Sequence, residues 1–200
     1  MKQGEYIKFF EKILTEKATN IITLYFVQKT ANNLKYRSFQ PSISSDIQHE
    51  IIDMVIPKLL NVLNNNRLVE FNPVGAADEE IEFINKIDVS AVDDYLASLN
   101  SENICKEIKN LIISRISFYC IRIVHNGKEV YLLRQFAKMK KLRNGLLTKI
   151  LNDELVALDG DFLCIDEDID MILCDEDLLV LNHISLERIF NYRDAYKAKT

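Results

Sequence analysis

Charged side chains are strongly segregated in the second half of this sequence of 200 residues. Residues 134–149 hold six basic side chains and no acidic one. These six are Arg134, Lys138, Lys140, Lys141, Arg143 and Lys149. We call residues 138–149 the basic segment. Because lysine and arginine neutralise phosphates and release their counterions, we predict that the stretch 134–149 binds the phosphate backbone of DNA. The alternative is that the basic segment pairs with neighbouring acids in the folded protein.

Eleven acidic residues and no basic one lie between residues 153 and 177, and we call this stretch the acidic run. Residues 166–170 together with Asp177 have the approximate spacing of a calcium-binding loop. Met171 stands where such a loop needs glycine, and Asp177 stands where it needs a bidentate glutamate, so we expect no metal there. A metal-dependent nuclease that uses the carboxylates of residues 166–170 is kept as a third functional hypothesis.

Motifs of catalysis and cofactor binding are missing from the sequence. It has no P-loop, no dinucleotide-binding glycine pattern, no zinc-protease motif and no Ser, His, Asp order. The three histidines, His49, His125 and His183, lie on a predicted helix, beside a predicted turn and after a predicted strand. With five glycines in the whole chain, a glycine-rich loop around a cofactor is not expected. We therefore predict no catalytic residue and no cofactor.

A predicted β-hairpin precedes the basic segment and must position it. The Asn126-Gly127 pair favours a type I′ turn, because such a turn needs positive φ at both central residues. A two-residue loop then pairs Tyr119 with Arg134. Both faces of the hairpin are apolar apart from Arg122, so we expect it to lie at the centre of the fold, covered on both sides.

Short apolar segments separated by acids follow the basic segment, and a helical pattern begins at Ser185. The apolar segments are residues 154–160, 162–166, 169–174 and 178–182. Together with the hairpin they predict an antiparallel β-meander with flanking helices, and hence an α+β fold.

The first half of the sequence predicts an N-terminal helix, a hairpin and a kinked helix. Residues 6–14 have helical spacing, and residues 21–27 and 34–39 have the composition of two paired strands. A long amphipathic helix follows from a capping-box pattern that begins at Ser45. Pro57 inside this helix predicts a kink or a division into two helices, because proline removes a backbone hydrogen bond.

Shorter elements are predicted between the two halves. Residues 67–71 fit a short strand, and residues 77–98 fit two short helices divided near Ser90, with their acids on a solvated face. Residues 101–109 fit another short helix. We expect residues 1–200 to form a single domain, within which residues 1–110 and 111–200 can be two lobes.

The composition narrows the class of protein. Hydrophobic residues make up 48% and charged residues 28% of the chain, which is typical of globular proteins. A net charge of −5 argues against a generally basic nucleic-acid coat but leaves room for a local basic patch. The four cysteines show no C-x-x-C pair and are expected to be reduced. With no signal peptide and no apolar stretch of membrane-spanning length, we expect a cytoplasmic protein.

The order of strands and helix in the second half also resembles a known family. A tyrosine-bearing strand is followed by a strand ending in Arg134, by an Ile-Asp strand, and by Asn182 with a Glu-x-x-Phe helix. The matching stretches are Phe118-Tyr-Cys-Ile-Arg-Ile, Val130-Tyr-Leu-Leu-Arg, Leu155-Val-Ala-Leu-Asp, Ile169-Asp-Met-Ile, Leu179-Val-Leu-Asn and Leu186-Glu-Arg-Ile-Phe. Over about residues 115–196 the sequence resembles the conserved domain, of unknown function, in the KwaB component of the Kiwa anti-phage defence system.

The resemblance implies a cytoplasmic defence effector that binds DNA, forms homo-oligomers and works with a membrane-embedded defence partner protein, through which it could associate with the membrane. It implies no catalytic centre. On grounds of charge we assign the DNA contacts to the six basic residues of the stretch 134–149. Arg134 could instead be a buried partner of the Asp170 carboxylate.

Three functional hypotheses follow. The first is a non-enzymatic, DNA-binding anti-phage protein that holds the phosphate backbone with little reading of bases, because no recognition helix is evident. The second is a protein–protein interaction module that docks a partner through the acidic edge of the meander or the first helix, without nucleic acid. The third is the metal-dependent nuclease.

Overall fold

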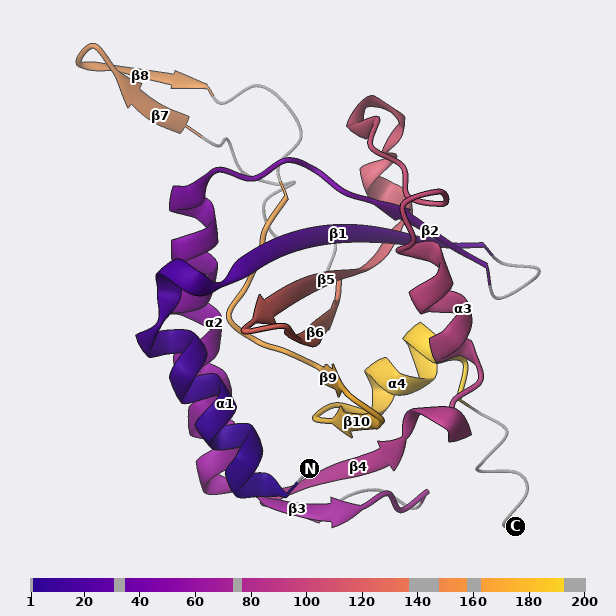
Figure 1. Cartoon of the computed structure of the whole chain (residues 1–200). Helices are drawn as coiled ribbons and strands as arrows, with labels where there is room; N and C mark the ends of the chain where they lie inside the picture. Colours follow the sequence, from indigo (N-terminus) through magenta and orange to yellow (C-terminus); the bar gives the residue numbers. More distant parts are fainter. Residues whose placement is uncertain (1, 31–34, 74–76, 137–147, 158–162, 193–200) are drawn as a thin grey trace.

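The computed structural model describes residues 2–30, 35–73, 77–136, 148–157 and 163–192. Eight of its strands form one sheet. They are β1 (Ile21–Lys29), β2 (Tyr36–Phe39), β3 (Arg67–Glu70), β4 (Glu80–Asn85), β5 (Ile116–His125), β6 (Lys128–Gln135), β9 (Met171–Cys174) and β10 (Asp177–Val180). Their order across the sheet is β2-β1-β5-β6-β9-β10-β4-β3 (Figure 1). Neighbouring strands are antiparallel except for β3 and β4, which are parallel.

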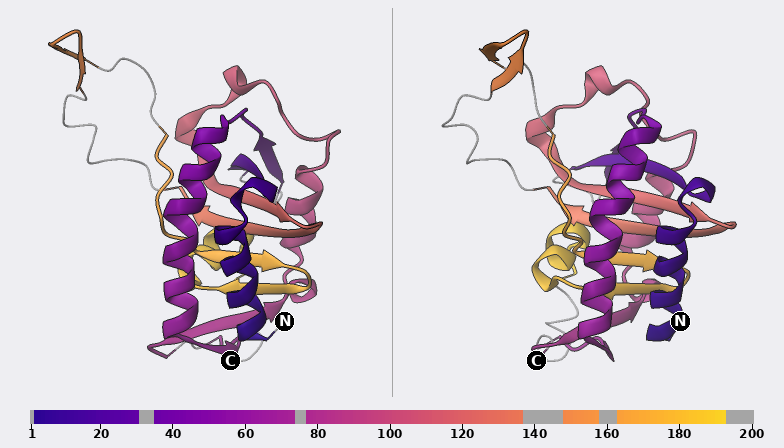
Figure 2. Two further views of the ribbon diagram at one scale, coloured as in Figure 1. Left: turned by 60° about the vertical axis from the view of Figure 1, so that its left-hand side comes forward. Right: turned by 90° about the vertical axis from the view of Figure 1, so that its left-hand side faces the viewer.

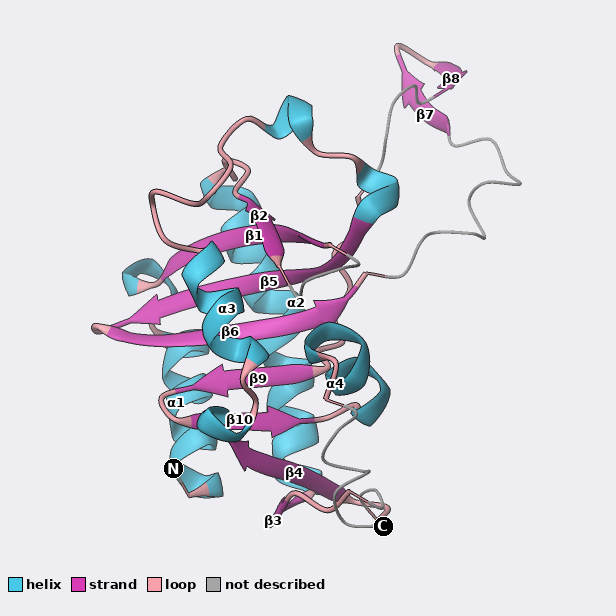
Figure 3. Cartoon of the chain, turned by 90° about the vertical axis from the view of Figure 1, so that its right-hand side faces the viewer, coloured by secondary structure: helices cyan, strands magenta, loops and turns pink. Residues whose placement is uncertain are grey.

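Four α-helices of the described residues pack on the two faces of this sheet. They are α1 (Gln3–Thr15), α2 (Ser45–Asn65), α3 (Ala91–Ser98) and α4 (His183–Phe190). The two long helices, α1 and α2, lie side by side on one face (Figure 2). The two short helices, α3 and α4, lie on the opposite face (Figure 3). The predicted α+β class is therefore confirmed. No helix in the described part of the chain has both the length and the apolar character needed to cross a membrane.

The central hairpin of β5 and β6 forms as the sequence predicts. The φ angles of Asn126 and Gly127 are 50° and 79°, which are the positive values that a type I′ turn requires. The register pairs Tyr119 with Arg134, as predicted. Leu132 is buried against the α1–α2 layer, whereas Leu133 is buried against the α3–α4 layer. Both faces of the hairpin are thus covered.

The first half of the chain confirms the predicted helix and strand pair and corrects the long helix. α1 is present, and β1 pairs antiparallel with β2, while residues 31–34 lie outside the described residues. The cap of α2 is Ser44, one residue earlier than predicted, and its hydroxyl accepts the Ile47 N–H. α2 continues through Pro57 without a break, so the division into two helices is wrong.

The predicted helix before Ser90 is a strand. Residues 80–85 form β4, which pairs with β10 on one side and with β3 on the other. Ile81 is buried on the α1–α2 side and Ile84 on the α3–α4 side. A separation of three residues puts side chains on opposite faces of a strand and on one face of a helix. The spacing of residues 80–85 is therefore compatible with a helix or a strand, and hydrogen bonding to β10 makes this segment a strand.

Other short elements differ from the prediction. The strand at β3 and the helix α3 are confirmed, but residues 101–109 hold no α-helix. Single turns of 3₁₀-helix occur at Lys17–Thr19, Lys86–Asp88, Ile108–Asn110 and Ile113–Arg115. The predicted meander is present, and it consists of the four strands β5, β6, β9 and β10. Two further strands, β7 (Thr148–Leu151) and β8 (Glu154–Ala157), pair with each other in a separate sheet, so residues 154–157 are not a strand of the meander. Residues 163–166 form no strand.

Strands from both parts of the chain share the eight-stranded sheet. β1 to β4 come from residues 1–110, and β5, β6, β9 and β10 come from residues 111–200. β1 lies next to β5, and β4 lies next to β10. The two predicted lobes are therefore joined twice by strand pairing, while the division into domains stays a prediction.

Two leucines provide a matched test of the core. Leu132 on β6 is 0% exposed, and Leu155 on β8 is 71% exposed. Leu132→Ala should lower the free energy of unfolding by about 2–5 kcal/mol, because it removes buried methyl groups and leaves a cavity. Leu155→Ala should change it by less than about 0.5 kcal/mol. Urea unfolding of both variants measures the difference, and equal effects would contradict the position of Leu132 between the two helix layers.

Candidate functional site

Arg134, at the end of β6, is surrounded by carboxylates of the acidic run. Its Nη1 lies 2.9 Å from Asp170 Oδ1, its Nε lies 3.1 Å from Asp166 Oδ1, and its Nη2 lies 3.6 Å from Asp168 Oδ2. The prediction that Arg134 is a partner of the Asp170 carboxylate is confirmed. Burial opposes the charge on the guanidinium, but the attraction of Asp170 and Asp166 outweighs this and raises the pKa of Arg134. Its role as a phosphate contact stays a prediction.

The Asp170 side chain is 2% exposed, and each of its oxygens accepts hydrogen bonds. Oδ2 accepts the Gln135 N–H at 2.7 Å, and Oδ1 accepts from Arg134 and from Asn182 Nδ2 at 3.3 Å. A buried carboxylate is tolerated only when its charge and its lone pairs are both satisfied. This network supplies both requirements.

The same residue fixes the backbone where three elements meet. The Asp170 N–H donates to Leu133 O at 2.9 Å, and its carbonyl accepts the N–H groups of Leu181 and Asn182. Asn182 in turn caps α4, because its Oδ1 accepts the Ile184 N–H at 3.0 Å. Asp170 therefore joins β6, the end of β10 and the start of α4.

The carboxylates that suggested a calcium loop are directed to basic side chains. Asp166, Asp168 and Asp170 face Arg134, and Glu167 lies 3.4 Å from the ammonium group of Lys58. Among the residues that the structure describes, no group of three or more His, Cys, Asp or Glu side chains is placed to hold a metal ion. The chemistry of this cluster is that of an ion-pair network.

Most of the basic segment lies outside the described residues, and so do four of the six predicted DNA contacts. These four are Lys138, Lys140, Lys141 and Arg143. Lys149 belongs to β7, and its side chain is not described. The structure does describe where the chain enters this segment: the Phe136 N–H donates to Ser117 O at 3.0 Å, beside the last pair of the β5–β6 ladder.

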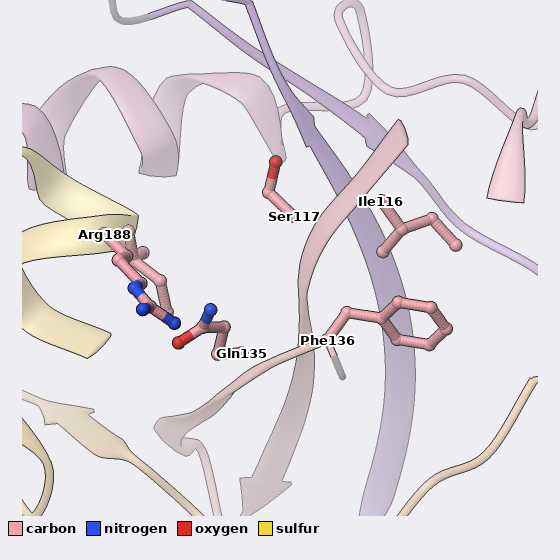
Figure 4. Close-up of a pocket in the computed structure, with 6 residues that line it drawn as sticks. Ile116, Ser117, Gln135, Phe136 and Arg188 are labelled. Carbon is pink, nitrogen blue, oxygen red and sulfur yellow. The ribbon is translucent and has the colours of Figure 1, made fainter. Parts of the chain in front are cut away.

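A pocket of about 370 Å³ lies at this end of the hairpin (Figure 4). Its lining residues are Ile116, Ser117, Gln135, Phe136, Arg188 and Ile189. Ser117, Gln135 and Arg188 lie on the α4 side of the strand, whereas the side chains of Ile116 and Phe136 point to the other side. The guanidinium of Arg188 and the amide of Gln135 point toward one another. We call this the β5–β6–α4 pocket.

The polar groups of this pocket are mainly donors. Ser117 Oγ accepts the Lys29 N–H at 3.2 Å, which leaves its own hydroxyl hydrogen for the pocket. Gln135 Oε1 accepts the hydroxyl of Ser185 at 3.3 Å, which leaves the Gln135 amino group. Arg188 adds an exposed guanidinium, and no acidic residue is among the lining residues that the structure describes. The arrangement is suited to an anion.

Sequence reasoning did not single out Ser117, Gln135 or Arg188. They come from β5, β6 and α4, and no motif links positions so far apart in the chain. The available signal was that Gln135 and Ser117 lie at the end of the predicted hairpin from which the basic segment leaves. The position of α4 above that end could not be read from the sequence.

A second pocket, of about 450 Å³, is lined mainly by acidic and aromatic side chains. It is lined by Glu70, Phe71, Phe83, Ile84, Asn85, Asp88 and Tyr192. The Phe71 and Tyr192 rings meet edge to face, with their centroids 5.6 Å apart. Two carboxylates and aromatic faces favour a cation, so this pocket does not fit a phosphate.

The buried ion pair predicts a large difference between two aspartates. Asp170→Asn should lower the free energy of unfolding by about 3 kcal/mol, because it removes the buried partner of Arg134. The matched control Asp168→Asn changes a side chain that is 53% exposed and should cost less than about 1 kcal/mol. Urea unfolding of both variants tests this, and an Asp170→Asn protein as stable as the control would contradict the network.

Comparison with known proteins finds a similarity in the second half of the chain. A family model described as "Kiwa protein KwaB-like" matches residues 113–200. No curated protein and no solved structure matches the chain. The matched region contains the central hairpin, Arg134, the acidic run, α4 and all lining residues of the β5–β6–α4 pocket. Over residues 113–200 this chain is therefore similar to KwaB-like Kiwa proteins, a similarity that suggests an association with anti-phage defence.

Proposed function

We propose that this chain acts in Kiwa anti-phage defence as a non-enzymatic protein that binds the phosphate backbone of DNA. The observation that carries the proposal is that the run of basic residues begins, in sequence, next to a donor-lined pocket. The acid-free basic segment begins two residues after Phe136, and Phe136 lines a pocket whose polar side chains are donors. Cationic side chains along a segment of this kind neutralise phosphates and release counterions.

The pairing of the acidic run supports this assignment. Arg134 and Lys58 take up the acids of residues 166–170, Lys128 lies 2.8 Å from Asp175, and Lys86 lies 3.0 Å from Glu176. All four cations lie outside the basic segment. These acids therefore have partners of their own, which weakens the alternative that they neutralise residues 138–149.

Backbone contact with little reading of bases is the mode that this fold favours. The helices on the pocket side, α3 and α4, are eight residues long and bury one face against the sheet. Neither presents a long exposed face that could enter a major groove. Phosphate contacts position a protein on DNA without distinguishing sequences, which suits a protein that acts on foreign DNA of any sequence.

A membrane-embedded defence partner and self-association belong to the same proposal, since the family resemblance implies them. Docking of a partner without nucleic acid is the second candidate function. The acidic and aromatic pocket beside β3 and β4 favours it, because it fits a cationic segment of a protein. The apolar face of α1 does not favour it, because Tyr6, Phe10 and Ile13 are fully buried inside the protein.

Loss of the basic segment should remove salt-sensitive DNA binding. The variant carries Lys138→Ala, Lys140→Ala, Lys141→Ala and Arg143→Ala. Its slope of log K against log salt should fall by about one for each lost phosphate contact. Fluorescence anisotropy of a labelled duplex, titrated at low and moderate salt, measures affinity and slope.

A variant with Lys2→Ala, Lys8→Ala, Lys12→Ala and Arg67→Ala is the matched control. It removes the same charge from exposed positions on α1, its N-cap and β3. It should keep most of the binding. If it loses as much affinity as the first variant, net charge rather than the basic segment governs binding. No binding by the unchanged protein at low salt would refute the proposed function.

A further inference from the structure

We propose that the β5–β6–α4 pocket holds the terminal phosphate monoester of a nucleic-acid strand. This inference rests on the proposed DNA binding and adds a site that recognises a strand end. It would give the protein two kinds of contact with DNA, one along the backbone through the basic segment and one at the terminus through the pocket.

The donor set of the pocket matches a phosphate with several free oxygens. The Ser117 hydroxyl comes from β5, the Gln135 amino group from β6 and the Arg188 guanidinium from α4. Because Gln135 is held by the hydroxyl of Ser185, which is 1% exposed, its amide has a fixed orientation. Donors from three elements converge on one volume, so they can bind three oxygens from different directions.

The positive charge of Lys29 makes the C-terminal end of α4 favourable for a bound anion. A helix end with free carbonyl groups carries partial negative charge, which would repel a phosphate beside Arg188. The Lys29 ammonium donates to Arg188 O at 2.8 Å and to the Asn191 side chain, just beyond the last residue of α4. A full positive charge therefore lies against the helix end next to the pocket.

The shape of the site favours a strand end over a continuous backbone. A phosphodiester has a sugar on both sides and offers two free oxygens with one negative charge, so it cannot enter a recess without the chain on either side. A terminal phosphate has three free oxygens, a second ionisation and a sugar on one side only. The volume of about 370 Å³ is within the range of roughly 300–1,000 Å³ typical of ligand pockets, which leaves room for the attached sugar.

The position of the pocket relates it to the basic segment. Phe136 lines the pocket and is the last described residue before residues 137–147. Asp170, the ion-pair partner of Arg134, accepts the backbone N–H of Gln135, so the same ion pair holds this wall of the pocket.

The test compares ends on one DNA sequence. Short labelled duplexes carry a 5′-phosphate, a 3′-phosphate or hydroxyl groups at both ends, and a closed circular duplex provides DNA without ends. The unchanged protein should bind one phosphorylated form about tenfold more tightly than the hydroxyl form, the size expected from one or two charge-assisted hydrogen bonds. The two phosphorylated duplexes show which terminus is used.

Variants then locate the preference. Arg188→Gln and Ser117→Ala should each reduce the preference for the phosphorylated end and leave binding of the hydroxyl-ended duplex unchanged. Arg67→Gln, an exposed arginine at the far edge of the sheet, is the control and should keep it. Thermal unfolding checks that each variant is folded, and Ser117→Ala alone decides if Arg188→Gln does not fold.

The outcomes separate the two proposals. Equal affinity for all ends would overturn the terminal-phosphate site and leave backbone binding intact. A preference that survives both pocket variants would also overturn it. If no duplex binds, the proposed function fails, and the phosphate site is tested by titrating the protein with a nucleoside 5′-monophosphate in a calorimeter. Binding that Arg188→Gln loses would support the phosphate site. No binding would overturn it.

Discussion

The buried carboxylate of Asp170 is the constraint on which the C-terminal half of this fold depends. A charge that is 2% exposed must be neutralised and fully hydrogen-bonded, or its desolvation outweighs what packing contributes. Arg134 supplies the charge, and Gln135 and Asn182 supply the remaining donors. Those three residues belong to β6, to its last position and to the cap of α4. Satisfying one carboxylate therefore sets the register of β9 on β6 and the point at which α4 begins.

The same network explains the separation of charge. Acids of residues 166–170, 175 and 176 pair with Arg134 and with lysines of α2, β6 and the turn after β4. The protein can thus be acidic as a whole and still leave one segment basic. The two pockets follow the same division, since one is lined by donors and the other by carboxylates and aromatic rings.

The region that the family model matches and the rest of the chain supply different parts of the structure. Residues 113–200, which the family model matches, contain Arg134, Asp170, the basic segment and every lining residue of the β5–β6–α4 pocket. The preceding residues contribute α1 and α2, which bury one face of the central hairpin, and β1, whose Lys29 neutralises the end of α4. The part matched by the family model therefore relies on the first half for one layer of its core and for one charge beside its pocket.

The sequence by itself determined the features that depend on local chemistry. Asn126-Gly127 fixed the turn and, through it, the register of β5 and β6, because a two-residue loop leaves one pairing. Apolar residues on both faces of the hairpin predicted that both faces are covered. Pairing with Asp170 was one of two roles that the sequence left open for Arg134. The helical periodicity of α1 and α2 was equally evident, since amphipathic spacing is a local property.

Only the tertiary structure decided which strands pair over long distances. Residues 80–85 have a spacing that serves a helix or a strand, and hydrogen bonding to β10 makes them β4. Residues 154–157 resemble a meander strand, yet they pair with β7 instead of the main sheet. The pocket was beyond the sequence for the same reason: Ser117, Gln135 and Arg188 are brought together by long-range pairing and by the packing of α4, and no local pattern encodes such contacts.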